Sequence, residues 1–187
     1  ISDAADLARA ESNARALGWE PVVFPHALAR DGYLAGGDAL RVADLNAAIR
    51  DPRIDGIWCL RGGYGAMRIL DAIDYDALRR SPKAVIGYSD ITALHLAIRA
   101  RCELVSYHGP TARAVLTEFT RQSLRRAMHR DGDPFAGAPA LRWSREGNAA
   151  GPLEGGNLAL LSALIGTPYS ARLDGAILVL EDVDEPP

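Results

Sequence analysis

Residues 84–95 read AVIGYSDITALH, an apolar run of strand type that stops at a glycine and is followed at once by a helical pattern. Ile91, Leu94 and Ile98 recur at helical spacing and define one face of that helix. A strand–turn–helix of this kind can lift a serine hydroxyl into an open crevice, at the positive end of a helix. Ser89 occupies the turn, so it is either a candidate nucleophile or only a helix cap. The usual elbow, G-x-S-x-G, is matched in part, because Ile91 stands at its last position.

Composition limits the classes of protein to which the chain can belong. Its 187 residues and 48% apolar content are enough to bury the core of one domain or somewhat more. The net charge of −3 and the scattered arginines argue against nucleic acid or an anionic membrane as partner. Cys59 and Cys102 lie in apolar surroundings and are expected to be buried and unpaired, which suits a reducing cytoplasm. No Cys/His cluster has metal-ligand spacing, so no metal or other cofactor is expected.

Strand-like and helical segments alternate along the first two thirds of the chain. Strands are predicted over 21–24, 54–60, 84–87 and 104–107, with helices over 2–17, 38–50, 66–73 and after Ser89. This alternation predicts a parallel, doubly wound sheet. Because the sequence opens on a helix, a preceding strand is expected to be missing, and the chain reads as a piece of a longer protein.

Ligands of such sheets bind where loops leave the carboxyl ends of the strands. Three loops are expected on that rim: 61–65, 88–90 and 108–110. Their coincidence favours a catalytic Ser89 over a simple cap.

The composition of the sequence changes after the first domain, which is predicted to cover 1–118. A linker is predicted over 119–145, because it contains a stretch rich in Asp, Gly and Pro after a helix over 120–128. The start of a second domain follows at 146–187. Further elements are predicted as a strand within 141–151, a Leu-rich helix ending at Ile165 and a buried strand over 176–180.

A serine nucleophile needs a base and N–H donors for the developing oxyanion. Gly62 and Gly63 let the backbone approach a substrate closely, and the N–H of Asp90 is the usual second donor. The same loop could be an ordinary glycine-rich turn; it lacks the lysine and the spacing of a phosphate loop. Among the four histidines, only His108 is expected on the rim, more as a pocket-lining residue than as the base. Glu181 either orients a histidine or belongs to a solvated acidic turn.

Taken together, these segments resemble the LD-carboxypeptidases of serine peptidase family S66, which include the microcin C immunity peptidases. The matching motifs occur in the family's order across nearly the whole chain. They are DGIWCLRGGYG at 55–65, IGYSDITALH at 86–95, HGP at 108–110, GGNL at 155–158, GTPY at 166–169 and LEDV at 180–183. Each motif alone is weak, and the ordered set is specific.

The resemblance implies a flavodoxin-like α/β domain, a parallel sheet with helices on both faces, followed by part of a smaller β-rich C-terminal domain. It implies a cytoplasmic enzyme that cleaves the amide between an L-centre and a terminal D-amino acid. The typical substrate is a murein tetrapeptide, which loses D-Ala during peptidoglycan recycling. The family also suggests a homodimer.

The family's pattern also implies roles for individual residues. Ser89 is the nucleophile and Glu181 the acid of a Ser–His–Glu triad, while backbone groups of Gly62, Gly63 and Asp90 form the oxyanion hole. Contacts with the substrate peptide are predicted for a further set of residues: Arg61, Tyr64, His108 and Asn157.

The sequence departs from the family's pattern in one respect, and two alternative functions also have to be considered. The family's catalytic histidine lies beyond residue 187, so this chain is expected to carry two triad members and to show little turnover. A microcin-immunity peptidase would be expected to carry an aromatic-rich loop for a nucleobase, and Trp143 is the only aromatic in the short segment before Gly155. In a non-catalytic domain that binds muropeptides, Ser89 would serve only as a cap.

Overall fold

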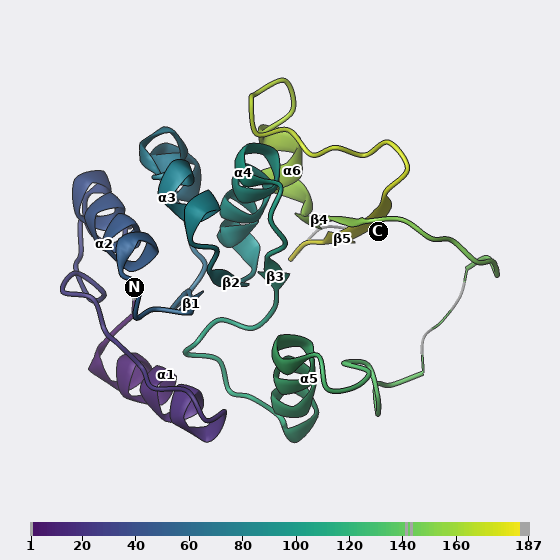
Figure 1. Cartoon of the computed structure of the whole chain (residues 1–187), viewed down its shortest axis with the longest axis horizontal. Helices are drawn as coiled ribbons and strands as arrows, with labels where there is room; N and C mark the ends of the chain where they lie inside the picture. Colours follow the sequence, from purple (N-terminus) through teal and green to yellow (C-terminus); the bar gives the residue numbers. More distant parts are fainter. Residues whose placement is uncertain (1, 141, 143, 184–187) are drawn as a thin grey trace.

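The computed structural model describes residues 2–140, 142 and 144–183. A central sheet lies between two layers of helices, and a smaller pair of strands packs beside it toward the C-terminus (Figure 1). The strands of the central sheet are parallel and lie in the order β1-β2-β3. Their bounds are β1 (Gly56–Trp58), β2 (Ala84–Gly87) and β3 (Tyr107–His108). The predicted parallel sheet is therefore confirmed, and β2, which leads to Ser89, lies at its centre.

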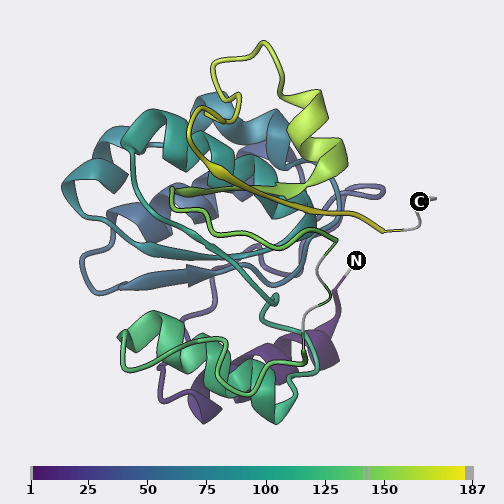
Figure 2. The same ribbon diagram turned by 90° about the vertical axis from the view of Figure 1, so that its right-hand side faces the viewer.

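Helices cover both faces of this sheet (Figures 1 and 2). One face carries α2 (Asp38–Arg50), α3 (Tyr75–Arg80) and α4 (Thr92–Cys102), and the other carries α1 (Ala4–Ala16) and α5 (Glu118–His129). Val85 and Ile86 are both 2% exposed and point to opposite faces, because side chains alternate along a strand. Val85 packs into the core formed with α2, α3 and α4, whereas Ile86 packs with Leu17 and Leu124 from the other layer. Burial on both faces is what a doubly wound sheet requires.

Two short helices connect β1 to β2. The first, η1 (Ala66–Ala72), is a 3-10 helix at the position predicted for a helix over 66–73. The second, α3, was not predicted from the sequence, because six residues are too few to show a helical period. Its cap is Asp74, whose carboxylate accepts a hydrogen bond from the Ala77 N–H at 2.9 Å. None of the helices in the described ranges has the length and apolar character needed to cross a membrane.

The strand predicted over 21–24 is not formed, and this expectation was wrong. The segment has no regular secondary structure, and Val22 and Val23 are 59% and 41% exposed. A strand requires a neighbouring strand for its backbone N–H and C=O groups. The described part of the chain places no strand beside this segment, so an apolar composition alone does not make it one.

The C-terminal part forms a β–α–β unit. It consists of β4 (Leu153–Asn157), α6 (Leu158–Ala163) and β5 (Ile177–Glu181). The two strands are parallel, and their register pairs Asn157 with Glu181. The end of β5 thus lies beside the start of α6.

Two predictions for the region after residue 118 need correction. The strand at 176–180 is present but not buried, because Leu178, Val179 and Leu180 are 47%, 46% and 51% exposed. Its only described neighbour is β4, so most of each side chain stays in contact with solvent. The helix predicted over 120–128 is confirmed, because α5 covers these residues within the segment predicted as a linker. No strand is seen in the described residues of 141–151; Leu141 and Trp143 lie outside them.

Candidate active site

Ser89 lies at a sharp turn between β2 and α4. It begins a 3-10 turn, Ser89–Ile91, and has a φ of 64°, in the left-handed region that residues other than glycine seldom adopt. Gly87 makes the turn possible, since a Cβ at this position would lie 2.8 Å from a methyl group of Ile91. A half-buried serine held at positive φ between a strand and a helix is the geometry of a nucleophile elbow.

The glycine loop after β1 lies directly against this serine. A Cβ placed on Gly62 would be 3.0 Å from Ser89 Cβ, 3.3 Å from Ser89 Oγ and 3.2 Å from the Tyr88 carbonyl oxygen. A Cβ at these distances would require the neighbouring atoms to shift by a few tenths of an ångström, so glycine suits this close approach of the backbone. Gly63 follows with a φ of 118°, which also favours glycine. The structure therefore brings Gly62, one of the two predicted loop donors, next to the nucleophile candidate, and Gly63 is the next residue of the same loop.

Asp90 points its side chain away from solvent and toward the same loop. It is 6% exposed, and its Oδ2 accepts a hydrogen bond from the Ala66 N–H at 2.9 Å. Burial raises the pKa of the Asp90 carboxyl, and the Ala66 N–H together with the nearby Arg41 and Arg61 guanidinium groups offsets part of that rise. Asp90 thus links the turn of Ser89 to the end of the glycine loop.

Glu181 reaches the same rim from the end of β5. Its Oε1 lies 3.7 Å from Nε2 of His108, which ends β3. That distance exceeds a direct hydrogen bond. Glu181 Oε1 is buried and has no hydrogen-bond partner among the described residues. Burial lowers the pKa of His108, and the Glu181 carboxylate offsets part of this effect.

The C-terminal strands contact α4 closely. Arg99 donates from Nε to Glu154 Oε1 at 2.7 Å, and the Glu154 side chain is only 5% exposed. Gly156 lies so close to α4 that a Cβ there would be 2.7 Å from Thr92 Oγ1 and 3.3 Å from His108 Nδ1. Because β5 pairs with β4 along its whole length, these contacts also set the position of Glu181.

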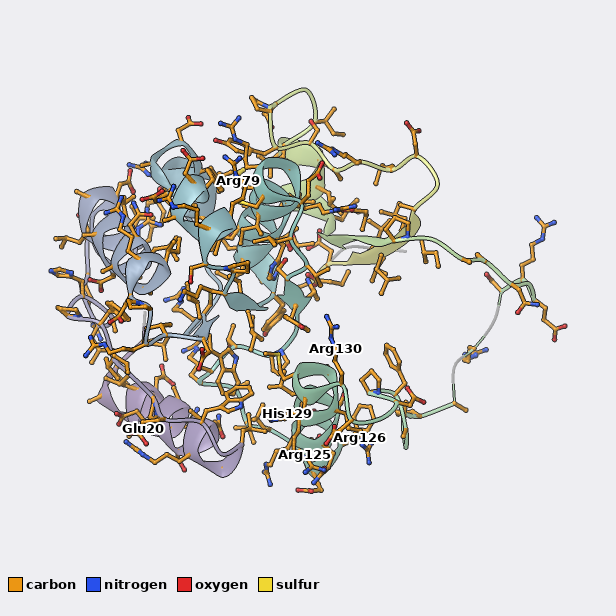
Figure 3. All side chains as sticks on the ribbon, in the orientation of Figure 1. Glu20, Arg79, Arg125, Arg126, His129 and Arg130 are labelled. Atoms are coloured by element: carbon orange, nitrogen blue, oxygen red, sulfur yellow. The ribbon has the colours of Figure 1, made fainter. Side chains whose placement is uncertain are left out.

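The other histidines are directed elsewhere. His95 is 8% exposed, with Nε2 2.9 Å from the Gly87 carbonyl oxygen and Nδ1 2.9 Å from Ser106 Oγ. Burial lowers its pKa to about 4, so the ring is neutral, donates to Gly87 and accepts from Ser106. His26 pairs with Asp44, and His129 lies on α5, in the helix layer opposite α4 (Figure 3).

The remaining predicted site residues fall into two groups. Arg61 and Tyr64 belong to the loop beside Ser89: Arg61 Nε donates to the Gly62 carbonyl oxygen at 2.9 Å, and Tyr64 is 76% exposed. Asn157 is 6% exposed and uses its amide within the protein. Its Oδ1 accepts from the Leu160 N–H at 3.2 Å, and its Nδ2 donates to Asp182 at 3.0 Å, which caps α6. A substrate contact by the Asn157 side chain stays a prediction.

A cavity of about 300 Å³ opens beside the elbow. It is lined by Tyr88, His108, Gly109, Pro110 and Ala114. Since Tyr88 directly precedes Ser89, a small, largely apolar group could lie here while an attached carbonyl reaches the hydroxyl. Within the described ranges, no cluster of three or more His, Cys, Asp or Glu side chains could hold a metal ion.

Residues 1–109 match the profile of the LD-carboxypeptidase N-terminal domain, and residues 150–187 match that of the LD-carboxypeptidase C-terminal domain. The chain belongs to the LD-carboxypeptidase family. Its sequence is 44% identical over 187 residues to a "Putative carboxypeptidase" of Streptomyces coelicolor, covering 90% of this chain and 57% of that protein. It is 39% identical over 162 residues to the "Probable murein peptide carboxypeptidase" of Bacillus subtilis, covering 83% and 51%.

The fold of this LD-carboxypeptidase chain is also that of solved structures. An MccF-like protein from Bacillus anthracis is 29% identical, with a TM-score of 0.84 over 96% of this chain and 62% of that one. The flavodoxin-like sheet followed by part of a second domain is therefore confirmed. The chain spans between half and three fifths of the length of the two curated relatives.

Proposed function

We propose that this chain is part of a serine-type carboxypeptidase that removes a C-terminal D-amino acid from a murein peptide. One observation carries the proposal: Ser89 stands at a φ of 64° between strand and helix, and the backbone of Gly62 lies against its side chain. A serine held in the left-handed backbone region, with the backbone of a glycine loop against its side chain, suits acyl transfer through a tetrahedral intermediate.

In the proposed reaction, Ser89 Oγ attacks the carbonyl carbon of the terminal amide and its proton passes to a base. Backbone N–H groups of Gly62, Gly63 and Asp90 stabilise the oxyanion. The amine of the terminal residue leaves with a proton, and water then hydrolyses the ester on Ser89. The chemistry needs no metal or redox cofactor.

The mechanism also requires a base that accepts the proton of the Ser89 hydroxyl. The family resemblance assigns it to a histidine outside residues 1–187, oriented by Glu181. The buried Glu181 Oε1, without a partner among the described residues, has an acceptor available for such a histidine. Residues 1–187 alone are then expected to turn over little substrate.

The substrate assignment follows from relatives. The Bacillus subtilis relative is named for a murein peptide, and the motifs shared with the family cover both matched domains. A terminal D-Ala on a murein tetrapeptide is accordingly the proposed substrate, with recycling in the cytoplasm as the proposed setting and a homodimer as the proposed assembly.

Ser89→Ala in the full-length protein tests the mechanism. D-Ala release from the murein tetrapeptide is followed with a coupled D-amino acid oxidase. A tetrapeptide ending in L-Ala is the stereochemical control, and its cleavage is followed by chromatography of the shortened peptide, because the oxidase does not detect L-Ala. We expect wild-type release only from the D-Ala peptide, and a loss of at least about a thousandfold in Ser89→Ala. Release by Ser89→Ala at the wild-type rate would exclude the serine mechanism.

A second candidate is the microcin-immunity type of activity, because the Bacillus anthracis neighbour is an MccF-like protein. An aminoacyl-sulfamoyl adenosine in the same assay separates the two: competition with the tetrapeptide at equal concentration favours this second function. A non-catalytic binding domain would bind the tetrapeptide without reaction of Ser89 with a fluorophosphonate.

A further inference from the structure

The peptide group between Gly65 and Ala66 is held at both of its ends by charged side chains. Its carbonyl oxygen accepts a hydrogen bond from Arg41 Nη1 at 2.9 Å. Its N–H donates to Asp90 Oδ2, also at 2.9 Å. Arg41 belongs to α2 and Asp90 to the turn at Ser89. Two separate parts of the chain therefore form hydrogen bonds with the same peptide group.

This peptide stands where the glycine loop ends and η1 begins. Gly65 has a φ of 105°, and a Cβ there would lie 3.0 Å from both terminal nitrogens of Arg41 and 2.9 Å from Leu34. A side chain at this position would crowd the guanidinium, and the positive φ also favours glycine. Glycine also leaves the backbone free to rotate, so the peptide plane would be poorly defined without the two charged partners.

Burial strengthens the two hydrogen bonds to this peptide group. Asp90 is 6% exposed and the Arg41 side chain 14% exposed. Hydrogen bonds to charged partners are roughly twice as strong as neutral ones, and shielding from water adds to this. Arg41 is itself paired with Asp38 on the same helix, which fixes the direction of the guanidinium.

We propose that Asp90 and Arg41 are positioning residues that clamp the Gly65–Ala66 peptide and so hold the Gly62–Gly63 backbone in register with Ser89. The inference rests on the proposed function, since it concerns the oxyanion donors of that reaction. It assigns the Asp90 carboxylate a task separate from that of its backbone N–H. The residue after the nucleophile then connects the two sides of the oxyanion hole, one through its main chain and one through its side chain.

The test compares four variants of the full-length protein: Asp90→Ala, Asp90→Asn, Arg41→Met and the control Asn46→Ala. Asn46 is a matched control because it is 8% exposed and also grips backbone, with Nδ2 2.9 Å from the Ala72 carbonyl oxygen and Oδ1 2.8 Å from the Asp74 N–H. Those contacts lie at the far end of η1, away from Ser89. Asparagine at 90 keeps an oxygen that can accept from Ala66.

Two rates are measured for each variant: D-Ala release, with kcat and KM separated, and phosphonylation of Ser89 by a fluorophosphonate. In the second reaction the serine oxygen bonds to phosphorus, fluoride leaves, and the phosphoryl oxygen occupies the oxyanion hole. We expect Asp90→Ala and Arg41→Met to lower kcat and the phosphonylation rate by about tenfold to a hundredfold with KM within about threefold. Asp90→Asn should lose less than about tenfold, and Asn46→Ala should lower the melting temperature while both rates stay near wild type.

The outcomes separate this inference from the proposed function. If Ser89 of the wild-type protein does not react with the fluorophosphonate and the protein releases no D-Ala, the proposed function and this inference are both wrong. Suppose instead that the wild-type protein reacts, and that Asp90→Ala and Arg41→Met react as fast as wild type or lose no more rate than an Asn46→Ala protein of equal melting temperature. The proposed positioning role of Asp90 and Arg41 is then wrong, and the peptidase assignment stands. Should Asp90→Ala fail to fold, Arg41→Met decides the question from the other end of the same peptide.

Discussion

The hydroxyl oxygen of Thr92 accepts a hydrogen bond from the backbone N–H of Asn157 at 3.0 Å, across 65 positions of sequence. Thr92 is fully buried in the first turn of α4, three residues after Ser89. Asn157 ends β4, opposite Glu181 in the β4–β5 register. This one contact therefore joins the portion that carries the serine to the portion that carries the acid.

Thr92→Val tests the contribution of that hydrogen bond, because valine keeps the shape and removes the hydroxyl. The Asn157 N–H would be left buried without an acceptor, so we expect a loss of about 1–3 kcal/mol in the free energy of unfolding, measured by urea denaturation. Thr92→Ser keeps the acceptor and should lose less. Equal stabilities for Thr92→Val and wild type would show that the contact contributes nothing.

Gly62→Ala tests the closeness of the glycine loop to the serine. The added methyl group would meet Ser89 Cβ at 3.0 Å, so either the loop or the turn must move. We expect D-Ala release to fall by about a hundredfold or more, the scale of losing an oxyanion donor. The control is Gly147→Ala, where a Cβ has nothing within 4 Å. A fully active Gly62→Ala protein would contradict the predicted oxyanion hole.

His108→Gln distinguishes a residue that lines the pocket from the catalytic base. As a lining residue, His108 contributes to binding, so we expect KM to rise by about tenfold while Ser89 still reacts with a fluorophosphonate. His129→Gln, at the exposed end of α5, is the control. A loss of several orders of magnitude in kcat, together with loss of phosphonylation, would instead identify His108 as the base.

The buried His95 is expected to make the free energy of unfolding depend on pH. The folded protein keeps this histidine neutral with a pKa of about 4, whereas the unfolded chain takes up a proton near pH 6.5. The unfolded state thus binds more protons between these values, and stability falls as pH drops from about 6.5 to about 4. The full effect of this group is about 3 kcal/mol, because each tenfold difference in proton affinity corresponds to about 1.4 kcal/mol.

The measurement compares urea denaturation at pH 7.5 and pH 4.5 for wild type and His95→Gln. Glutamine retains a donor for the Gly87 carbonyl and does not titrate, so its stability should change less between the two pH values. The same pH dependence in both proteins would show that His95 is not the group responsible.

Local sequence was sufficient for the elements that depend on neighbouring residues. The apolar run before Gly87 and the helical spacing of Ile91, Leu94 and Ile98 predicted the turn that presents Ser89. The alternation of such segments predicted the parallel sheet, and the ordered motifs predicted the family. The same local reasoning failed at Val22 and Val23. These residues have the composition of a strand, but the described part of the chain places no strand beside them.

Tertiary structure alone decided what the polar side chains contact. Residue type and spacing do not tell that Asp90 accepts from the Ala66 N–H, or that the Asn157 side chain caps α6. They do not tell which histidine faces Glu181, since His108 lies 73 positions away. Periodicity records which face of an element is buried, because burial repeats with the backbone geometry. A hydrogen bond depends instead on where two distant segments meet, and only the packed sheet and its loops bring those segments together.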